Sequence, residues 1–145
     1  MDKELTVREA MLLVLDKSPQ EFERMKNLFK QASDAFDMAN DQLGLQLISD
    51  EVFPIIRSLA EFCTSIFNYH LNILGDDIGF EFCEKVKRLN QLLTELAQET
   101  NSGNFTEVGD ILRFDMFDFI ADLEAFFPQI RKCFEESDSP SMDCT

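Results

Sequence analysis

The chain has 145 residues, a net charge of −15 and a pI near 4.3, and this length suffices for one domain with a hydrophobic core. Hydrophobic residues make up 45% of the chain, including fifteen Phe, which excludes a wholly disordered protein. The acidic balance argues against binding to nucleic acid or to anionic membranes, because both need clustered Lys and Arg. The scarcity of Gly and of β-branched runs favours helices over sheets.

The first ten residues, MDKELTVREA, lack the basic and apolar regions of a secretory signal, and no stretch has the length of a transmembrane helix. No C-x-x-C pair occurs among the four cysteines, which are Cys63, Cys83, Cys133 and Cys144. The first three lie in apolar helical patterns. We interpret these three as small hydrophobic residues in a reducing compartment, with disulfides as the alternative. The sequence therefore predicts a cytoplasmic protein.

The first predicted helix is short and covers VREAMLLVLD, residues 7–16, after a capping box formed by Thr6 and Glu9. We expect it to lie across the bundle that the rest of the chain forms. Ser18 and Glu21 form a second capping box around Pro19, which predicts the start of a new helix. The core face of that helix has apolar residues at alternating steps of three and four: Phe22, Met25, Phe29, Ala32, Phe36 and Ala39.

A second apolar series extends from Leu45 to Ile73 and contains Pro54, which predicts a kink near Asp50 or a late start of regular helix. Gly75 is expected to close this helix, and the two aspartates that follow can cap the next. The third series covers residues 82–96 and ends in the polar stretch 98–104. The fourth covers about residues 106–134.

Sliding the sequence over itself by 64 residues aligns apolar positions without a gap, for example Val52 with Met116. It also aligns Asn40 with Asn104, each placed as the N-cap of a second helix. Duplication of a helix–turn–helix unit explains this match, and chance phasing of two amphipathic helices is the alternative. The expected fold is an all-α four-helix bundle of two tandem αα-hairpins, with a short N-terminal helix. We expect one domain over residues 1–134, hairpins at about 19–74 and 77–134, and a disordered acidic tail at 135–145.

The fourth helix carries two apolar faces instead of one. Its core face is predicted to hold the residues Leu112, Met116, Phe119, Leu123, Phe126 and Ile130. Five other residues form a second line, which we call the outer strip: Phe114, Phe117, Ala121, Ala125 and Pro128. This strip either is covered by the N-terminal helix or meets another chain, since exposed aromatic residues anchor interfaces. Asp115, Asp118 and Asp122 on one flank are interpreted as a solvated acidic face and not as metal ligands.

No catalytic motif is present, and we expect no cofactor and no metal. The one histidine, His70, falls on an apolar helix face and is interpreted as a core residue. Cys63 lies two turns away on the same face, too far to share a metal directly. A small-ligand site or an enzyme site between the hairpins stays open as the alternative, with His70, Glu51 and Asp115 as its polar candidates.

The segment VGDILRFDMFDFI, residues 108–120, resembles a pattern of small uncharacterised bacterial helical proteins in which a Gly/Asp-led helix continues as Leu-x-aromatic-acid. The residues that carry it are Gly109, Asp110, Leu112, Phe114 and Asp115. This resemblance implies no activity and supplies no catalytic residues. More loosely, SPQEF at residues 18–22 is similar to the opening of flagellar and type III export chaperones, which are small, acidic, cytosolic and helical.

The expected function is that of a non-catalytic cytosolic interaction module, an adaptor, chaperone or assembly factor. It would bind a protein partner or a second copy of itself through the outer strip, and neither nucleic acid nor membrane. A small-molecule ligand stays open, as does the question whether the chain is an enzyme.

Overall fold

Residues 6–136 are described in the computed structural model, and all the elements in this range are helical. Two of the elements, η1 and η2, are short π-helices that join α-helices without a break. The order is α1 (Val7–Asp37), α2 (Asp41–Leu47), η1 (Ile48–Val52), α3 (Phe53–Tyr69), α4 (Leu71–Ser102), α5 (Phe105–Asp110), η2 (Ile111–Met116) and α6 (Phe117–Glu136). Because α2–η1–α3 and α5–η2–α6 are each continuous, residues 6–136 form four rods, and the predicted all-α four-helix bundle is confirmed.

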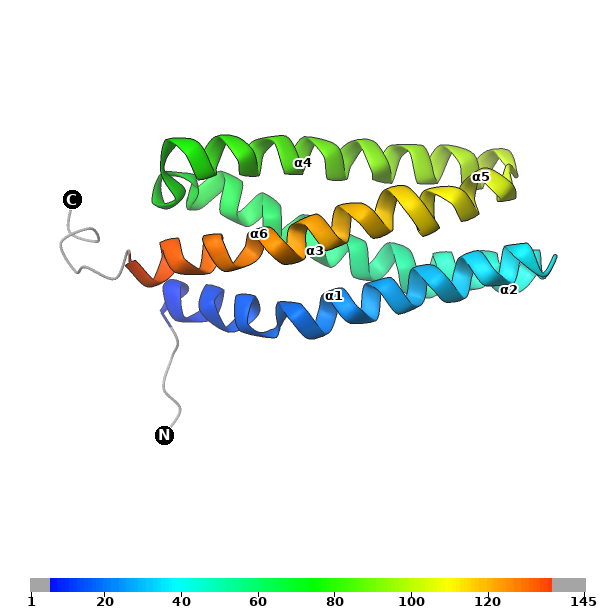
Figure 1. Cartoon of the computed structure of the whole chain (residues 1–145), viewed down its shortest axis with the longest axis horizontal. Coiled ribbons are helices and arrows are strands. Elements are labelled where there is room, and N and C mark those ends of the chain that lie inside the picture. The colour runs from blue at the N-terminus through cyan, green and yellow to red at the C-terminus, as the bar shows by residue number, and fades with distance from the viewer. Residues whose placement is uncertain (1–5, 137–145) are drawn as a thin grey trace.

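The four rods run alternately in opposite directions along one long axis (Figure 1). α1 packs against α2 and α6, and α4 packs against α3 and α6, so that α3 and α6 lie on opposite sides of the bundle. α6 therefore has one face toward the core, two flanks toward α1 and α4, and one face that is directed outward.

The core forms along the predicted apolar faces, because every rod turns one stripe toward the other three. Phe22, Phe29 and Phe82 are at most 1% exposed, and the predicted core face of α6 is buried throughout. Ala39 is an exception, since α1 ends at Asp37 and Ala39 lies outside it with a φ of 60°. Gly44 lies so close to the Phe36 ring that a Cβ added there would lie 2.6 Å from ring atom Cζ.

The short N-terminal helix expected at residues 7–16 is not a separate element, because α1 continues through Pro19 to Asp37. The capping box at its start is confirmed, with Thr6 Oγ1 accepting from the Glu9 amide and the Thr6 amide donating to Glu9. Ser18 does not cap a new helix. Pro19 has no N–H for the Leu15 carbonyl four residues earlier, and the Ser18 hydroxyl donates to that carbonyl at 2.7 Å instead.

The two π-helices occupy equivalent places in the two halves of the chain. Ile48–Val52 falls on residues 112–116 after the predicted shift of 64, and η2 covers Ile111–Met116. Each wide turn fits one extra residue into the helix. η1 precedes Pro54 and lies where a kink or a late start of regular helix was expected, near Asp50, whereas no proline follows η2 within its next turn. A proline therefore does not explain the wide turn of η2, in which Ile111, Leu112 and Met116 are buried.

Three other boundaries differ from the sequence prediction. α3 ends at Tyr69, earlier than expected, whereas the break expected at Gly75 is confirmed as a kink inside α4, where the backbone is non-helical with a φ of 79°. Asn40 caps α2 as predicted, but the Asn104 side chain donates to Glu99 and does not cap α5. α6 continues to Glu136, so the first two residues of the expected tail are helical, and residues 137–145 lie outside the described range.

Candidate functional site

The outer strip lies on the outward face of α6 and the adjoining η2. Phe114 is 55% exposed and Phe117 is 39% exposed, and the three smaller strip residues are exposed as well. The helical period explains the placement, because residues 117, 121, 125 and 128 lie within about one quarter of the helix circumference, opposite the buried face. An apolar line of this kind on an outward face is a candidate contact surface.

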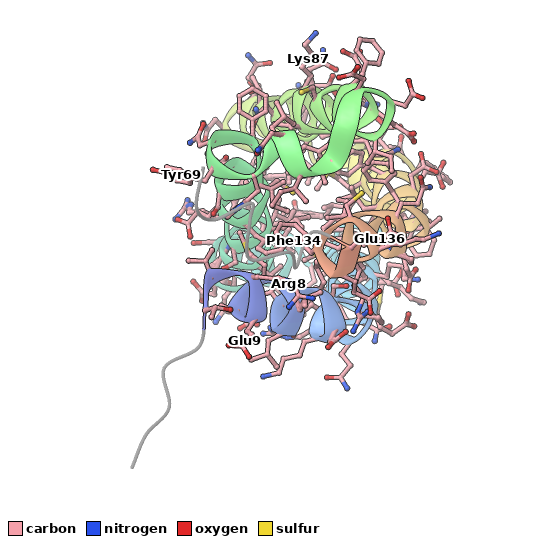
Figure 2. All side chains as sticks on the ribbon, turned by 90° about the vertical axis from the view of Figure 1, so that its left-hand side faces the viewer. Arg8, Glu9, Tyr69, Lys87, Phe134 and Glu136 are labelled. Carbon is pink, nitrogen blue, oxygen red and sulfur yellow. The ribbon has the colours of Figure 1, made fainter. Side chains whose placement is uncertain are left out.

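The first turns of α1 do not cover this strip. Arg8 Nε donates to the Phe134 carbonyl at 2.8 Å, which places the start of α1 at the C-terminal end of α6 (Figure 2). Phe114 lies at the other end of that rod. Because α1 is one continuous helix and not a separate element folded across the bundle, the interpretation in which its first residues shield Phe114 and Phe117 is wrong.

A hollow of about 280 Å³ lies beside Phe117, at the seam between α1 and the η2–α6 rod. Phe29 and Leu112, both fully buried, form its apolar base, and Phe117 forms one wall. Lys30 and Arg113 stand at its rim. We call this feature the α1–α6 hollow. It extends the aromatic end of the outer strip inward to the core.

The α1 flank of the strip is rich in charges that are already paired. Lys26 Nζ lies 2.9 Å from Glu124, and the same nitrogen lies 5.8 Å from the centre of the Phe117 ring. The hydrogen bond from Lys26 to Glu124 raises the pKa of that lysine. Further ion pairs join α1 to the other rod along this flank: Arg113 with Asp37, and Arg131 with Asp16. The hydrogen bond from Arg131 lowers the pKa of Asp16.

The other flank of α6 carries carboxylates with no such partners. Asp118 and Asp122 are exposed, and neither forms an ion pair with another residue in the range 6–136. The helical period puts them on the side away from Glu124 and Arg131, toward α4. We call these two residues the acidic row. Asp115 is also exposed at the start of the same side. The outer strip is therefore bordered by neutralised charges on one side and by free negative charges on the other.

The polar groups proposed for a site between the hairpins do not converge. Glu51 lies 3.6 Å from Arg24 and is paired with it, Asp115 is exposed, and His70 lies at the far end of the bundle in the α3–α4 turn. Across the described residues, no group of three potential ligands is placed to hold a metal ion. The small-ligand alternative therefore lacks the polar cluster on which it depended.

The side chains that could take part in a reaction are packed among apolar residues. His70 is half-buried, and its ring lies edge-on to Phe134 at 5.4 Å. Cys63 is buried, and burial raises the pKa of its thiol to about 12, which keeps it protonated and unreactive at neutral pH. A second hollow of about 110 Å³ between α1 and α3 is lined mainly by apolar side chains, including Phe22 and Phe62. None of these features assembles a reactive pair.

Partial burial lowers the pKa of His70 below its ordinary value of 6.5. The unfolded chain therefore takes up a proton at this site before the folded chain does, so we expect the free energy of unfolding to fall as the pH drops below 6.5 and the loss to level off at the lower pKa of the folded state. Urea unfolding of wild type and His70→Asn over the mildly acidic range measures this. The variant should lack this component, and identical pH profiles would contradict the prediction.

No family model, curated protein or solved structure matches the chain. The two resemblances drawn from residues 108–120 and 18–22 thus stay predictions. Within residues 6–136, no helix is both long enough and apolar enough to cross a membrane.

The sequence pointed to the outer strip but not to the α1–α6 hollow. That hollow needs Phe29 and Lys30 of α1 beside Phe117, and the periodicity of one helix does not say which neighbour it packs against. The sequence placed the aspartates on one flank of α6, but the ion pairing on the other flank was missed for the same reason, because partners of Glu124 and Arg131 are on α1.

Proposed function

We propose that the chain is a non-catalytic protein–protein interaction module, an adaptor, chaperone or assembly factor, that receives a helix of a partner on the outer strip. The proposal includes a cytosolic setting, which is supported by Cys63, Cys83 and Cys133 being free thiols in the described part of the chain.

The observation that carries the proposal is a comparison of the two halves of the molecule. The residues 64 positions before the outer strip occupy the matching turns of η1 and α3, and they are Asp50, Phe53, Arg57, Glu61 and Thr64. All but Phe53 are exposed, and three are charged. The same backbone position thus accepts charged residues in one half and carries apolar residues in the other. The bundle itself does not require the apolar strip, and contact with another molecule accounts for it.

We expect Phe114→Asp to abolish partner capture without unfolding the protein, because Phe114 is more than half exposed and a carboxylate there would lose its hydration on contact. The measurement is affinity purification from the native cell with tagged wild type and variant. Phe80→Asp is the matched control, since Phe80 is a 70% exposed aromatic residue on α4, outside the strip.

A protein that wild type and Phe80→Asp capture, but Phe114→Asp does not, should then bind the purified chain with the same dependence. Equal capture by all three proteins, or capture lost equally in both variants, would show that the outer strip is not the binding surface. A tagged second copy as the captured protein would identify self-association as the role of the strip.

A further inference from the structure

We infer that the partner segment is a basic amphipathic helix, which inserts one bulky apolar side chain into the α1–α6 hollow and directs Lys or Arg toward the acidic row. This inference rests on the proposed function and specifies the partner of the same surface. It depends on three features: an apolar socket, a line of small residues and an uncompensated row of carboxylates.

The socket is the α1–α6 hollow at the aromatic end of the strip. Its volume of about 280 Å³ and its base of Phe29 and Leu112 suit a large apolar side chain. Interfaces obtain most of their affinity from a few such anchors in pockets that exclude water. Phe117 supplies a wall that an incoming side chain would cover, and its exposure of 39% is the apolar surface available for burial.

The rest of the strip suits the backbone of a helix. Ala121 and Ala125 are exposed and small, and they lie one turn apart on α6. Helix axes approach more closely where the side chains at the contact are small. A helix anchored beside Phe117 and lying along α6 would therefore pass directly over these alanines and bring its flanking side chains to the level of the acidic row.

The charges that border the outer strip favour a basic partner helix. Asp118 and Asp122 are exposed and have no ion-pair partner within residues 6–136, while Lys26, Arg113 and Arg131 on the opposite flank are already paired with carboxylates. The border of the strip therefore presents net negative charge, as does the chain as a whole at −15. Lys or Arg on a partner would find free carboxylates, and complementarity of this kind governs partner choice and association rate.

The same charges disfavour an antiparallel pair formed with a second copy of the chain. Two α6 helices packed antiparallel through their outer strips would be related by a two-fold axis that keeps each flank on its own side. The acidic row of one copy would then face the acidic row of the other. Facing carboxylates repel, and they would do so around a contact that is only one helix wide.

The test uses the purified chain and three amidated helical peptides of about 18 residues, a length at which helices persist. The first has a Leu stripe flanked by Lys, the second has Glu in place of Lys, and the third has Ala in place of Leu. We expect the first peptide to bind at least about tenfold more tightly than the other two by calorimetry, because it alone offers both anchor and charge. Amide NMR shifts should map its binding to η2, α6 and the facing part of α1.

The charge contribution is tested with the double variant Asp118→Asn/Asp122→Asn. Removing two exposed ion pairs should weaken binding of the first peptide between about twofold and thirtyfold. The control is Glu61→Gln/Glu95→Gln, which removes the same charge from exposed positions on α3 and α4. This control should bind as wild type does.

Equal weakening in the two double variants would mean that the net charge alone attracts the peptide, and would overturn the inference. So would equal binding of all three peptides, binding that maps to another face, or no binding of the Leu–Lys peptide at millimolar concentration. If the native partner is lost on Phe114→Asp but kept by Asp118→Asn/Asp122→Asn, the interaction module stands and the basic helix is wrong. Dimerisation of wild type that Phe114→Asp removes would also favour a second copy over a basic partner.

Discussion

We expect deletion of Phe114 to leave the bundle folded and deletion of Ala125 to destroy it, although both residues are exposed on the same rod. Phe114 lies inside η2, whose wide turn contains one residue more than a regular helix. Removing that residue lets the turn close into an α-helix. Leu112 on one side and Met116 on the other, both fully buried, would keep their places in the core.

Ala125 lies in regular α-helix, so its deletion rotates everything that follows by about 100°. Phe126, Ile130 and Phe134, each at most 2% exposed, would leave their buried places. Arg131 and Glu135 would take the places of Ile130 and Phe134, and only Phe127, which would move into the place of Phe126, would stay in the core. At about 1.5–3 kcal/mol for each buried side chain, the combined loss of the three is comparable to the whole stability of a domain, about 5–15 kcal/mol.

Straightening of η2 would not rescue the Ala125 deletion. It would restore the residues after 125 but advance the preceding ones by one position, so that Asp118 and Asp122 would take the buried places of Phe119 and Leu123. Circular dichroism and urea unfolding of both deletions measure the difference. A cooperative transition in the Ala125 deletion, or its loss in the Phe114 deletion, would contradict the assignment of the extra residue to η2.

The second large effect is expected for Phe22→Ala, which should lower the free energy of unfolding by about 3–5 kcal/mol. Phe22 is 1% exposed, and its ring meets Phe127 edge to face at 4.9 Å, so truncation removes both buried surface and an aromatic pair. The void would also join the existing hollow of about 110 Å³ between α1 and α3, which Phe22 lines.

Urea unfolding compares this variant with Phe80→Ala, which removes the same atoms from an exposed position and should change stability by less than about 0.5 kcal/mol. Similar losses in the two variants would show that Phe22 does not lie in the core. A Phe22→Ala/Phe127→Ala double variant less destabilised than the sum of the single ones would measure the ring contact directly.

Hydrophobic periodicity predicted the four rods and most of the core. Each helix must bury one apolar stripe, and the residues of that stripe recur at alternating spacings of three and four along the sequence. Pro54 predicted an irregularity near Asp50, and η1 lies there. No nearby proline explains its counterpart at η2. Only the alignment of the two halves by 64 residues relates the position of η2 to that of η1.

The errors arose where tertiary packing outweighed local signals. Ser18, Pro19 and Glu21 form a good helix start, yet the apolar face from Met11 through Leu15 to Phe22 is buried without interruption, which favours one continuous helix. The Ser18 hydroxyl then satisfies the carbonyl that Pro19 leaves free. For the candidate site, the sequence located the outer strip on one helix. The hollow and the paired flank needed knowledge of which helix lies beside it.

The bond between Arg8 and the Phe134 carbonyl spans 126 residues and joins the first turn of α1 to the last turns of α6. Helix ends fray readily, because their last carbonyls have no partner within the helix. Here the guanidinium of Arg8 also donates to the Glu135 carbonyl, so it caps a helix end that belongs to the other extreme of the chain. The two extremes of the described chain thus form a single unit of local stability, in which loosening one releases the other.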